Sequence, residues 1–157
     1  MHKSENIGYE PALVNTERGQ QRIEGVRNNQ RVLLTDYSLA HEMWGSLCKY
    51  APPILGNSEA VGLNEMFRFY KYEPGQEFKK HRDQSFIRNE VEASYFTMMI
   101  YLNDGFEGGE TTFDNLRIKP KKGMCLIFFH DLEHEGTKLK SGVKYVLRTD
   151  IMYKLKE

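Results

Sequence analysis

The sequence predicts a mainly β fold, a sandwich or barrel of short strands with a helix packed on one sheet. After residue 66, apolar runs recur between turn residues, and we expect strands at 67–73, 94–104, 110–113, 116–120, 123–131 and 142–153. The run 94–104 is continuously apolar, which indicates burial on both faces. Before residue 66, only 39–50 places apolar residues at helical spacing.

The N-terminal part, residues 1–30, is polar and irregular, with one extended piece at 12–14. Residues 31–36 predict a strand, and polar side chains at 35–38 can cap the helix that follows. Trp44 shares the apolar positions of this helix, so we expect it to pack on a sheet. The sequence contains no repeat, low-complexity tract or linker, and we expect residues 1–157 to form a single domain.

Charge and composition narrow the class of protein. The 22 basic and 22 acidic side chains of the 157 residues cancel, which argues against a broad nucleic-acid or membrane surface. No apolar run approaches the ~18 residues of a membrane span, and the N-terminus lacks the apolar core of a signal peptide. Cys48 and Cys125 resemble small apolar residues more than a disulfide pair. We therefore expect a reducing, cytoplasmic location.

The stretch Phe69 to Asp83 carries the first functional signal. Pro74-Gly75 divides it into two extended runs, so it predicts a β-hairpin. His81 and Asp83 lie two positions apart and therefore point to the same face. With a second histidine, for which His134 is the candidate, they would form the facial triad that holds non-haem Fe(II). A His-x-Asp pair on its own is common, and a solvated face is its ordinary explanation.

The last predicted strand offers cations for an acidic co-substrate. Lys144 and Arg148 are four positions apart, so both face the same side of a regular strand. Isolated basic residues usually extend to solvent, but two on one face of an otherwise apolar strand are harder to explain in that way.

Five blocks then occur in order: Tyr72, His81-x-Asp83, YLNDGFEGGETTF, FFHDLEHEG and Gly-Val-Lys144. In this order and spacing they resemble the 2-oxoglutarate- and Fe(II)-dependent dioxygenases, and most closely the prolyl 4-hydroxylase-like branch. The resemblance is dense over residues 66–154 and looser over 8–50. Each block alone is weak, whereas five in the right order are specific.

The resemblance implies a double-stranded β-helix (jelly-roll) core with flanking helices. It also implies roles for individual residues: His81, Asp83 and His134 as iron ligands, Lys144 as the cation for the distal carboxylate of 2-oxoglutarate, and Tyr72 and Thr111 as further co-substrate contacts. Arg148 has no equally firm counterpart. It is expected either to make a second anion contact, to co-substrate or substrate, or to pair with Asp150 or Glu135. Ascorbate is a further candidate cofactor.

The activity that the resemblance implies is hydroxylation of an unactivated C–H bond with Fe(II), dioxygen and 2-oxoglutarate, releasing succinate and carbon dioxide. The substrate class stays open between a prolyl or other side chain of a peptide or protein and a small molecule. Arg27, Asn29 and Arg31 look like the substrate-side segment of prolyl hydroxylases, although a solvated loop is the simpler explanation. The chain begins where family members usually carry a further strand and helix, so that element is expected to be truncated or absent.

Neighbouring residues receive lesser roles. His130 is expected beside the site or at an exposed edge, not as a ligand. Gly108 and Gly109 are expected to form a tight turn. Three alternative functions remain: a metal-dependent dioxygenase without 2-oxoglutarate, a zinc hydrolase, and a non-catalytic jelly-roll binding module.

Overall fold

The computed structural model of the chain describes residues 1–23 and 25–156, apart from the side chains of Lys3 and Asn15. Two antiparallel sheets account for most of the described strands, in agreement with the predicted mainly β class. The major sheet has the order β1 (Glu10–Pro11), β4 (Gln30–Thr35), β7 (Met66–Tyr72), β17 (Lys144–Leu155), β10 (Glu92–Tyr101) and β14 (Cys125–Phe129), and β5 (Ile54–Leu55), β6 (Ser58–Leu63) and β9 (Ile87–Asn89) join it off this path.

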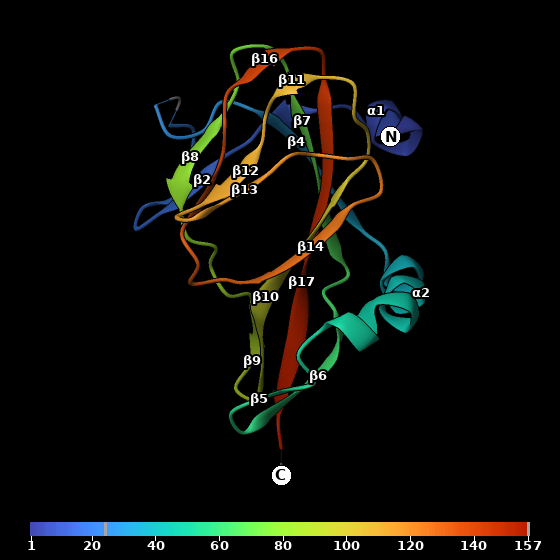
Figure 1. Cartoon of the computed structure of the whole chain (residues 1–157). Helices are drawn as coiled ribbons and strands as arrows, with labels where there is room; N and C mark the ends of the chain where they lie inside the picture. The colour runs from blue at the N-terminus through green and yellow to red at the C-terminus, as the bar shows by residue number, and fades with distance from the viewer. Residues whose placement is uncertain (24, 157) are drawn as a thin grey trace.

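The minor sheet has the order β13 (Leu116–Ile118), β12 (Thr111–Phe113), β15 (His134–Gly136) and β8 (Phe78–His81). Two strand pairs form separate two-stranded sheets: β2 (Val14–Thr16) with β3 (Gly19–Gln21), and β11 (Glu107–Gly108) with β16 (Leu139–Ser141). The helices are α1 (His2–Ile7), α2 (Tyr37–Leu47) and the 3-10 turn η1 (Cys48–Tyr50). Figure 1 shows α2 on one side of the long strand β17, and β8, β12 and β13 on the other.

Strand β17 runs through the centre of the major sheet. It pairs with β10 along most of its length, with β7 near its start and with β6 near its end. Its side chains alternate between two environments. Leu147 and Ile151 belong to the apolar cluster that also contains residues of α2, whereas Lys144, Val146 and Arg148 line a cavity on the opposite face. One strand therefore contributes both to the core and to the candidate site.

Helix α2 covers the outer face of the major sheet. The Asp36 side chain accepts a hydrogen bond from the backbone N–H of Leu39 at 3.0 Å and so caps the first turn. Met43 and Trp44 pack against the apolar cluster beneath the helix, as predicted for Trp44. The packing explains why this segment is helical, because its apolar stripe is buried only in that form.

The predicted hairpin of residues 69–83 is wrong. Strand β7 pairs with β4 and β17 in the major sheet, whereas β8 pairs with β15 in the minor sheet. The turn at Pro74-Gly75 is present, with Gly75 at φ 88°, but it carries the chain from one sheet to the other. A turn signal fixes where the chain reverses, and competition among possible partner strands decides what each run pairs with.

Two smaller expectations are also corrected. The N-terminal part was expected to be irregular, but it forms α1, β1, β2 and β3. Polar contacts with the major sheet hold it, including the ion pair of Glu5 with Lys71 at 3.1 Å. Cys48 is exposed and therefore no apolar filler, although both cysteines are free as expected. Among the described residues, no helix is long and apolar enough to cross a membrane.

The turn at Gly108 provides a test of the fold. Gly108 has φ 74°, and a Cβ built there would lie 2.4 Å from the carbonyl oxygen of Lys138. Gly105 has a similar φ of 80° with open space around it. Gly105→Ala should therefore cost only backbone strain, about 1 kcal/mol, whereas Gly108→Ala should cost about 3 kcal/mol because a clash is added. Urea unfolding of both variants measures the difference, and equal losses would contradict it.

Candidate metal and co-substrate site

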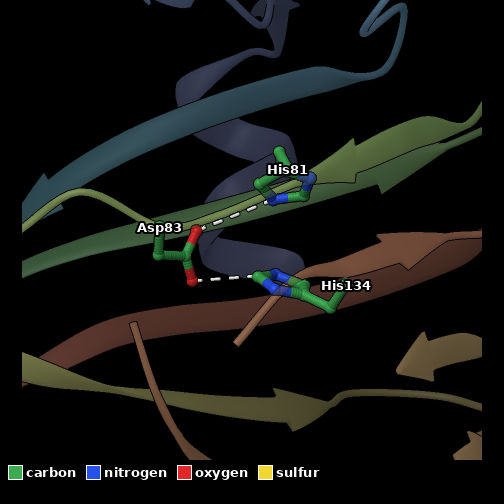
Figure 2. A group of neighbouring side chains, drawn as sticks. All are labelled: His81, Asp83 and His134. Atoms are coloured by element: carbon green, nitrogen blue, oxygen red, sulfur yellow. Dashed lines mark ion pairs between the residues drawn. The ribbon is translucent and has the colours of Figure 1, made fainter. Parts of the chain in front are cut away.

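His81, Asp83 and His134 come together between the two sheets. His81 ends β8 and His134 begins β15, and these two residues are register partners in the minor sheet. One ligand atom from each of the three residues lies within 4.8 Å of the others. Figure 2 shows both imidazole rings turned toward the carboxylate, with Nε2–oxygen distances of 3.6 Å for His81 and 3.7 Å for His134.

Backbone carbonyls orient both imidazoles. Nδ1 of His81 lies 2.7 Å from the carbonyl oxygen of Lys79, and Nδ1 of His134 lies 2.9 Å from that of Leu132. A carbonyl oxygen only accepts, so each Nδ1 carries the proton and each Nε2 keeps its lone pair. Burial also lowers the pKa of His134 below its ordinary value, which favours the neutral, ligating form.

Two residues of the major sheet hold the Asp83 carboxylate. The Thr97 hydroxyl donates a hydrogen bond to Oδ2 at 2.5 Å, and Nη2 of Arg148 lies 3.2 Å from the same oxygen. Burial alone would raise the pKa of Asp83, but the charge of Arg148 and these hydrogen bonds hold that pKa far below its ordinary value. The carboxylate is therefore ionised at any pH at which the protein would work.

This donor set fits ferrous iron. Two imidazole nitrogens and one ionised carboxylate converge on one point, and two nitrogens and one oxygen form the set that non-haem Fe(II) takes in a facial triad. All three residues also line the cavity described next, so the cluster borders open space.

Beside the cluster lies an inner cavity that contains Lys144. Lys144 is 2 % exposed, and its ammonium donates a hydrogen bond to the carbonyl oxygen of Gly109 at 2.6 Å. It also lies 4.8 Å from the ring centre of Tyr72. No carboxylate pairs with it among the described residues, and burial lowers its pKa to about 8. A buried cation without a counter-ion is costly, and a bound anion would remove that cost.

Hydroxyl groups surround the same cavity. The Tyr101 hydroxyl donates a hydrogen bond to Oγ1 of Thr111 at 2.6 Å, and Tyr72 and Thr111 both line the cavity with Lys144. Burial raises the pKa of Tyr72 and of Tyr101 to about 12, so both phenols stay protonated and can donate. The predicted co-substrate residues Tyr72, Thr111 and Lys144 thus meet in one place.

Arg148 is the residue whose role the sequence left undecided. Its Nη2 lies 3.2 Å from Asp83 and 3.2 Å from Asp150, so the predicted pairing with Asp150 occurs and that with Glu135 does not. Asp150 in turn has Nε2 of His130 at 3.7 Å and Arg68 at 3.0 Å. His130 is buried behind this pair and is no ligand of the cluster. Arg148 also lines both the inner and the outer cavity.

The segment 27–31 runs beside β8, in front of the cluster. A bridge joins Arg27 to Phe78, and Arg27 and Arg31 line an outer cavity together with His81. Asn29 does not line it. Its Oδ1 instead accepts a hydrogen bond from Nε of Arg27 at 2.7 Å, so that it fixes the arginine from behind.

The sequence interpretation missed three residues of the site. Thr97 binds the Asp83 carboxylate, Phe78 stacks on His81 with ring centres 3.5 Å apart, and Tyr70 lines both cavities. Of these three, Thr97 could most readily have been identified from the sequence, because a hydroxyl inside an apolar run of a buried strand needs a hydrogen-bond partner. Phe78 and Tyr70 carried no such signal, since aromatic residues in strands are ordinary core residues.

Three comparisons with known proteins agree with this geometry. Residues 67–149 match the family model of the 2OG-Fe(II) oxygenase superfamily. A protein of Acanthamoeba polyphaga mimivirus named "Putative prolyl 4-hydroxylase" is 26 % identical over 145 residues, which cover 78 % of this chain and 57 % of that protein. The chain thus spans little more than half the length of this relative.

Solved structures support the fold. The viral collagen prolyl hydroxylase of Paramecium bursaria Chlorella virus 1, in its 2-oxoglutarate complex, has a TM-score of 0.61 and 20 % identity, over 82 % of this chain and 81 % of that one. A Trichoplax adhaerens prolyl hydroxylase bound to a hypoxia inducible factor peptide has a TM-score of 0.69 and 17 % identity, over 96 % and 72 %.

These likenesses confirm the jelly-roll class predicted from the sequence. The family model covers more than half of the chain and includes β7, β8, β10, β12, β14 and β15, together with the first half of β17. The matched residues include all three residues of the candidate metal cluster and the buried lysine. The chain belongs to the 2OG-Fe(II) oxygenase superfamily.

Proposed function

We propose that the protein is a hydroxylase that uses Fe(II), dioxygen and 2-oxoglutarate, and that it acts on a prolyl residue of a peptide or protein. One observation carries the proposal: the cluster of His81, Asp83 and His134 shares a cavity with the unpaired, buried ammonium of Lys144. A metal site alone does not account for that lysine, whereas a dicarboxylic co-substrate bound to both does.

Each residue of the site has a separate task in this proposal. His81, Asp83 and His134 would hold the iron, which when bound supplies the activation of dioxygen for insertion of oxygen into a C–H bond. Lys144 binds the distal carboxylate of 2-oxoglutarate by a charge-assisted hydrogen bond. The open space of the inner cavity is about 40 Å³, so side chains must move to admit the co-substrate, and the unbranched Met99 on its wall is suited to that.

The residues around the cluster position the Asp83 carboxylate and shield the reacting centre from water. Thr97 and Arg148 keep the Asp83 carboxylate ionised and pointed at the two imidazoles. The apolar walls contributed by Phe128 and Val146 keep water away from the reacting centre. In this way the protein supplies orientation and a dry pocket, and the metal and co-substrate supply the reactive chemistry.

The prolyl part of the proposal draws on the relatives. The mimivirus relative and the solved viral and Trichoplax proteins all carry prolyl hydroxylase in their names, and the last is bound to a peptide. In this chain the outer cavity, of about 330 Å³, adjoins the metal cluster and is large enough for a side chain and its neighbours. A zinc hydrolase or a dioxygenase without co-substrate has no use for Lys144. Ascorbate stays a prediction.

The metal assignment predicts the result of anaerobic calorimetric titration with Fe(II). The wild-type protein should bind one equivalent, and His134→Ala should bind at least a hundredfold more weakly because one of three protein ligands is gone. His41→Ala is the matched control, since His41 is exposed on α2, and it should bind like the wild type. Equal weakening in both variants would contradict the assignment.

The co-substrate assignment predicts a pH dependence. Because the pKa of Lys144 is lowered to about 8, the lysine is mostly charged at pH 7 and mostly neutral at pH 9. The 2-oxoglutarate affinity of the Fe(II) protein should therefore fall about tenfold between these values. Lys144→Met should bind more weakly than the wild type at pH 7, with no further loss at pH 9, and the exposed Lys140→Met should behave like the wild type. The absorption of the Fe(II)–2-oxoglutarate chelate reports binding; a pH-independent wild type would remove Lys144 from this role.

Turnover tests the reaction itself. With Fe(II), 2-oxoglutarate and air, the protein should add one oxygen atom to proline-containing peptides and form one succinate per hydroxylated residue, both measured by mass spectrometry. Withholding either oxygen or 2-oxoglutarate should abolish the product. Cleavage of a peptide or ester bond without oxygen would favour a hydrolase, and oxygen-dependent hydroxylation without 2-oxoglutarate would favour a dioxygenase that needs no co-substrate.

A further inference from the structure

The outer cavity has a pronounced excess of positive charge. Its lining residues include one carboxylate, Asp83, which belongs to the metal cluster. They also include five guanidinium groups: Arg27, Arg31, Arg68, Arg82 and Arg148. The chain as a whole has no net charge, so this concentration of arginine is a local property of the cavity in front of the metal cluster.

Three of the five arginines are neutralised by acidic partners. Arg68 lies 3.0 Å from Asp150, Arg148 lies 3.2 Å from both Asp83 and Asp150, and Arg82 lies 3.5 Å from Asp131. The charges of these three arginines are therefore compensated by ion pairs within the protein. The two that remain, Arg27 and Arg31, have no ion pair with any described residue, although Glu10 lies opposite Arg31 on β1.

Arg27 is held rigidly and left with a free donor. It is 4 % exposed, and its guanidinium lies between the rings of Tyr70 and Phe78, at 4.3 and 4.2 Å. Nε is satisfied by Asn29, but Nη2 is buried without a hydrogen-bond partner among the described residues. A buried charged donor is rarely left unpaired in a native protein, so Nη2 marks a place for an acceptor that the chain itself does not provide.

Arg31 lies on the same wall. It is the register partner of Tyr70 across β4 and β7, and Tyr70 is one of the two rings that sandwich Arg27. Its Nη2 donates to the neutral side chain of Gln20 at 2.8 Å, and no carboxylate of the described residues forms an ion pair with it. Burial would raise the pKa of the Tyr70 phenol, yet the charges of Arg27, Arg148 and Arg68 outweigh burial and lower it to about 8. The wall is thus strongly electropositive.

This wall lies close to the reacting centre but outside the co-substrate cavity. Phe78 stacks on His81 with one face and on Arg27 with the other, so a single aromatic ring separates the arginine from a metal ligand. Neither Arg27 nor Arg31 lines the inner cavity that contains Lys144. An anion bound by Arg27 and Arg31 would therefore be distinct from the distal carboxylate of 2-oxoglutarate.

We propose, on the basis of the proposed function, that the peptide substrate carries a glutamate or aspartate within two residues of the hydroxylated one, and that Arg27 and Arg31 bind its carboxylate. Two planar guanidinium groups suit a carboxylate, because each presents parallel N–H donors to its two oxygens. The spacing follows from the stack: consecutive residues of an extended chain lie about 3.5 Å apart, and only one ring stands between Arg27 and His81.

The test measures peptide binding to the protein loaded anaerobically with Fe(II) and 2-oxoglutarate, so that no turnover occurs. The probes are fluorescein-labelled nonapeptides with a central proline and either Glu, Gln or Lys at each of the two positions on either side. In the wild type, at least one Glu peptide should bind about tenfold more tightly than its Gln counterpart, and the Lys counterpart should bind most weakly. The preference should shrink as salt rises from 50 to 500 mM.

Variants assign the preference to the wall. Arg31→Gln should reduce the Glu-over-Gln ratio to below about threefold, and Arg27→Lys, which keeps the charge but loses the fork, should reduce it partly. Arg117→Gln removes the same charge from exposed strand β13, outside both cavities, and should keep the full ratio. If one variant fails to fold, the wild-type ratio and the other variant still decide the matter.

The outcomes separate this inference from the proposed function. Equal binding of Glu and Gln peptides by the wild type, with the Fe(II)–2-oxoglutarate absorption intact, overturns the acidic-substrate proposal and leaves the oxygenase standing. A Glu preference that Arg117→Gln reduces as much as Arg31→Gln also overturns it, because the effect would then be one of net charge. Absence of the absorption in the wild type counts against the proposed function, and the ratio measured on the metal-free protein still tests the arginine wall.

Discussion

The carboxylate of Asp83 is where the two sheets are joined electrostatically. The residue follows β8 in the minor sheet, yet its oxygens are held by Thr97 on β10 and Arg148 on β17, both in the major sheet. A buried carboxylate is stable only when such partners are present. The cluster therefore depends on the correct packing of one sheet on the other, and any slip between them would separate the carboxylate from the donors that keep it ionised.

The buried charge of Lys144 destabilises the folded state. Lowering the pKa of Lys144 from its ordinary value of 10.5 to about 8 corresponds to about 3 kcal/mol against folding near neutral pH. The sign follows from linkage: the unfolded lysine is protonated below its ordinary pKa, so the penalty is complete below about pH 8 and disappears as pH rises toward that ordinary value. Such a cost is expected where a residue is kept for binding and not for stability.

The sequence predicted the parts of the structure that depend on local pattern. The alternation along β17 placed Lys144 and Arg148 on one face, and the spacing of His81 and Asp83 placed both toward His134. The errors came where distant strands choose partners. Residues 69–83 were expected to pair with themselves, but β17 offers β7 a longer apolar partner, and β8 pairs with β15 instead. The N-terminal strands were missed because polar segments of two or three residues carry no periodicity.

Insertions and deletions should be tolerated less within β17 than in the segment that precedes it. Lys144, Val146 and Arg148 line the inner cavity and Asp150 pairs with Arg148, whereas Leu147 and Ile151 on the other face belong to the core, and the strand spaces Lys144 and Arg148 by about 13 Å. Loss of one residue between Lys144 and Arg148 would leave them three positions apart, so one of the two cations would turn to the opposite face, toward α2. Between His134 and Lys144 the chain passes through β16 and a turn at Gly142, where added residues can bulge outward. Homologous chains should accordingly vary in length before Lys144 and hold their length after it.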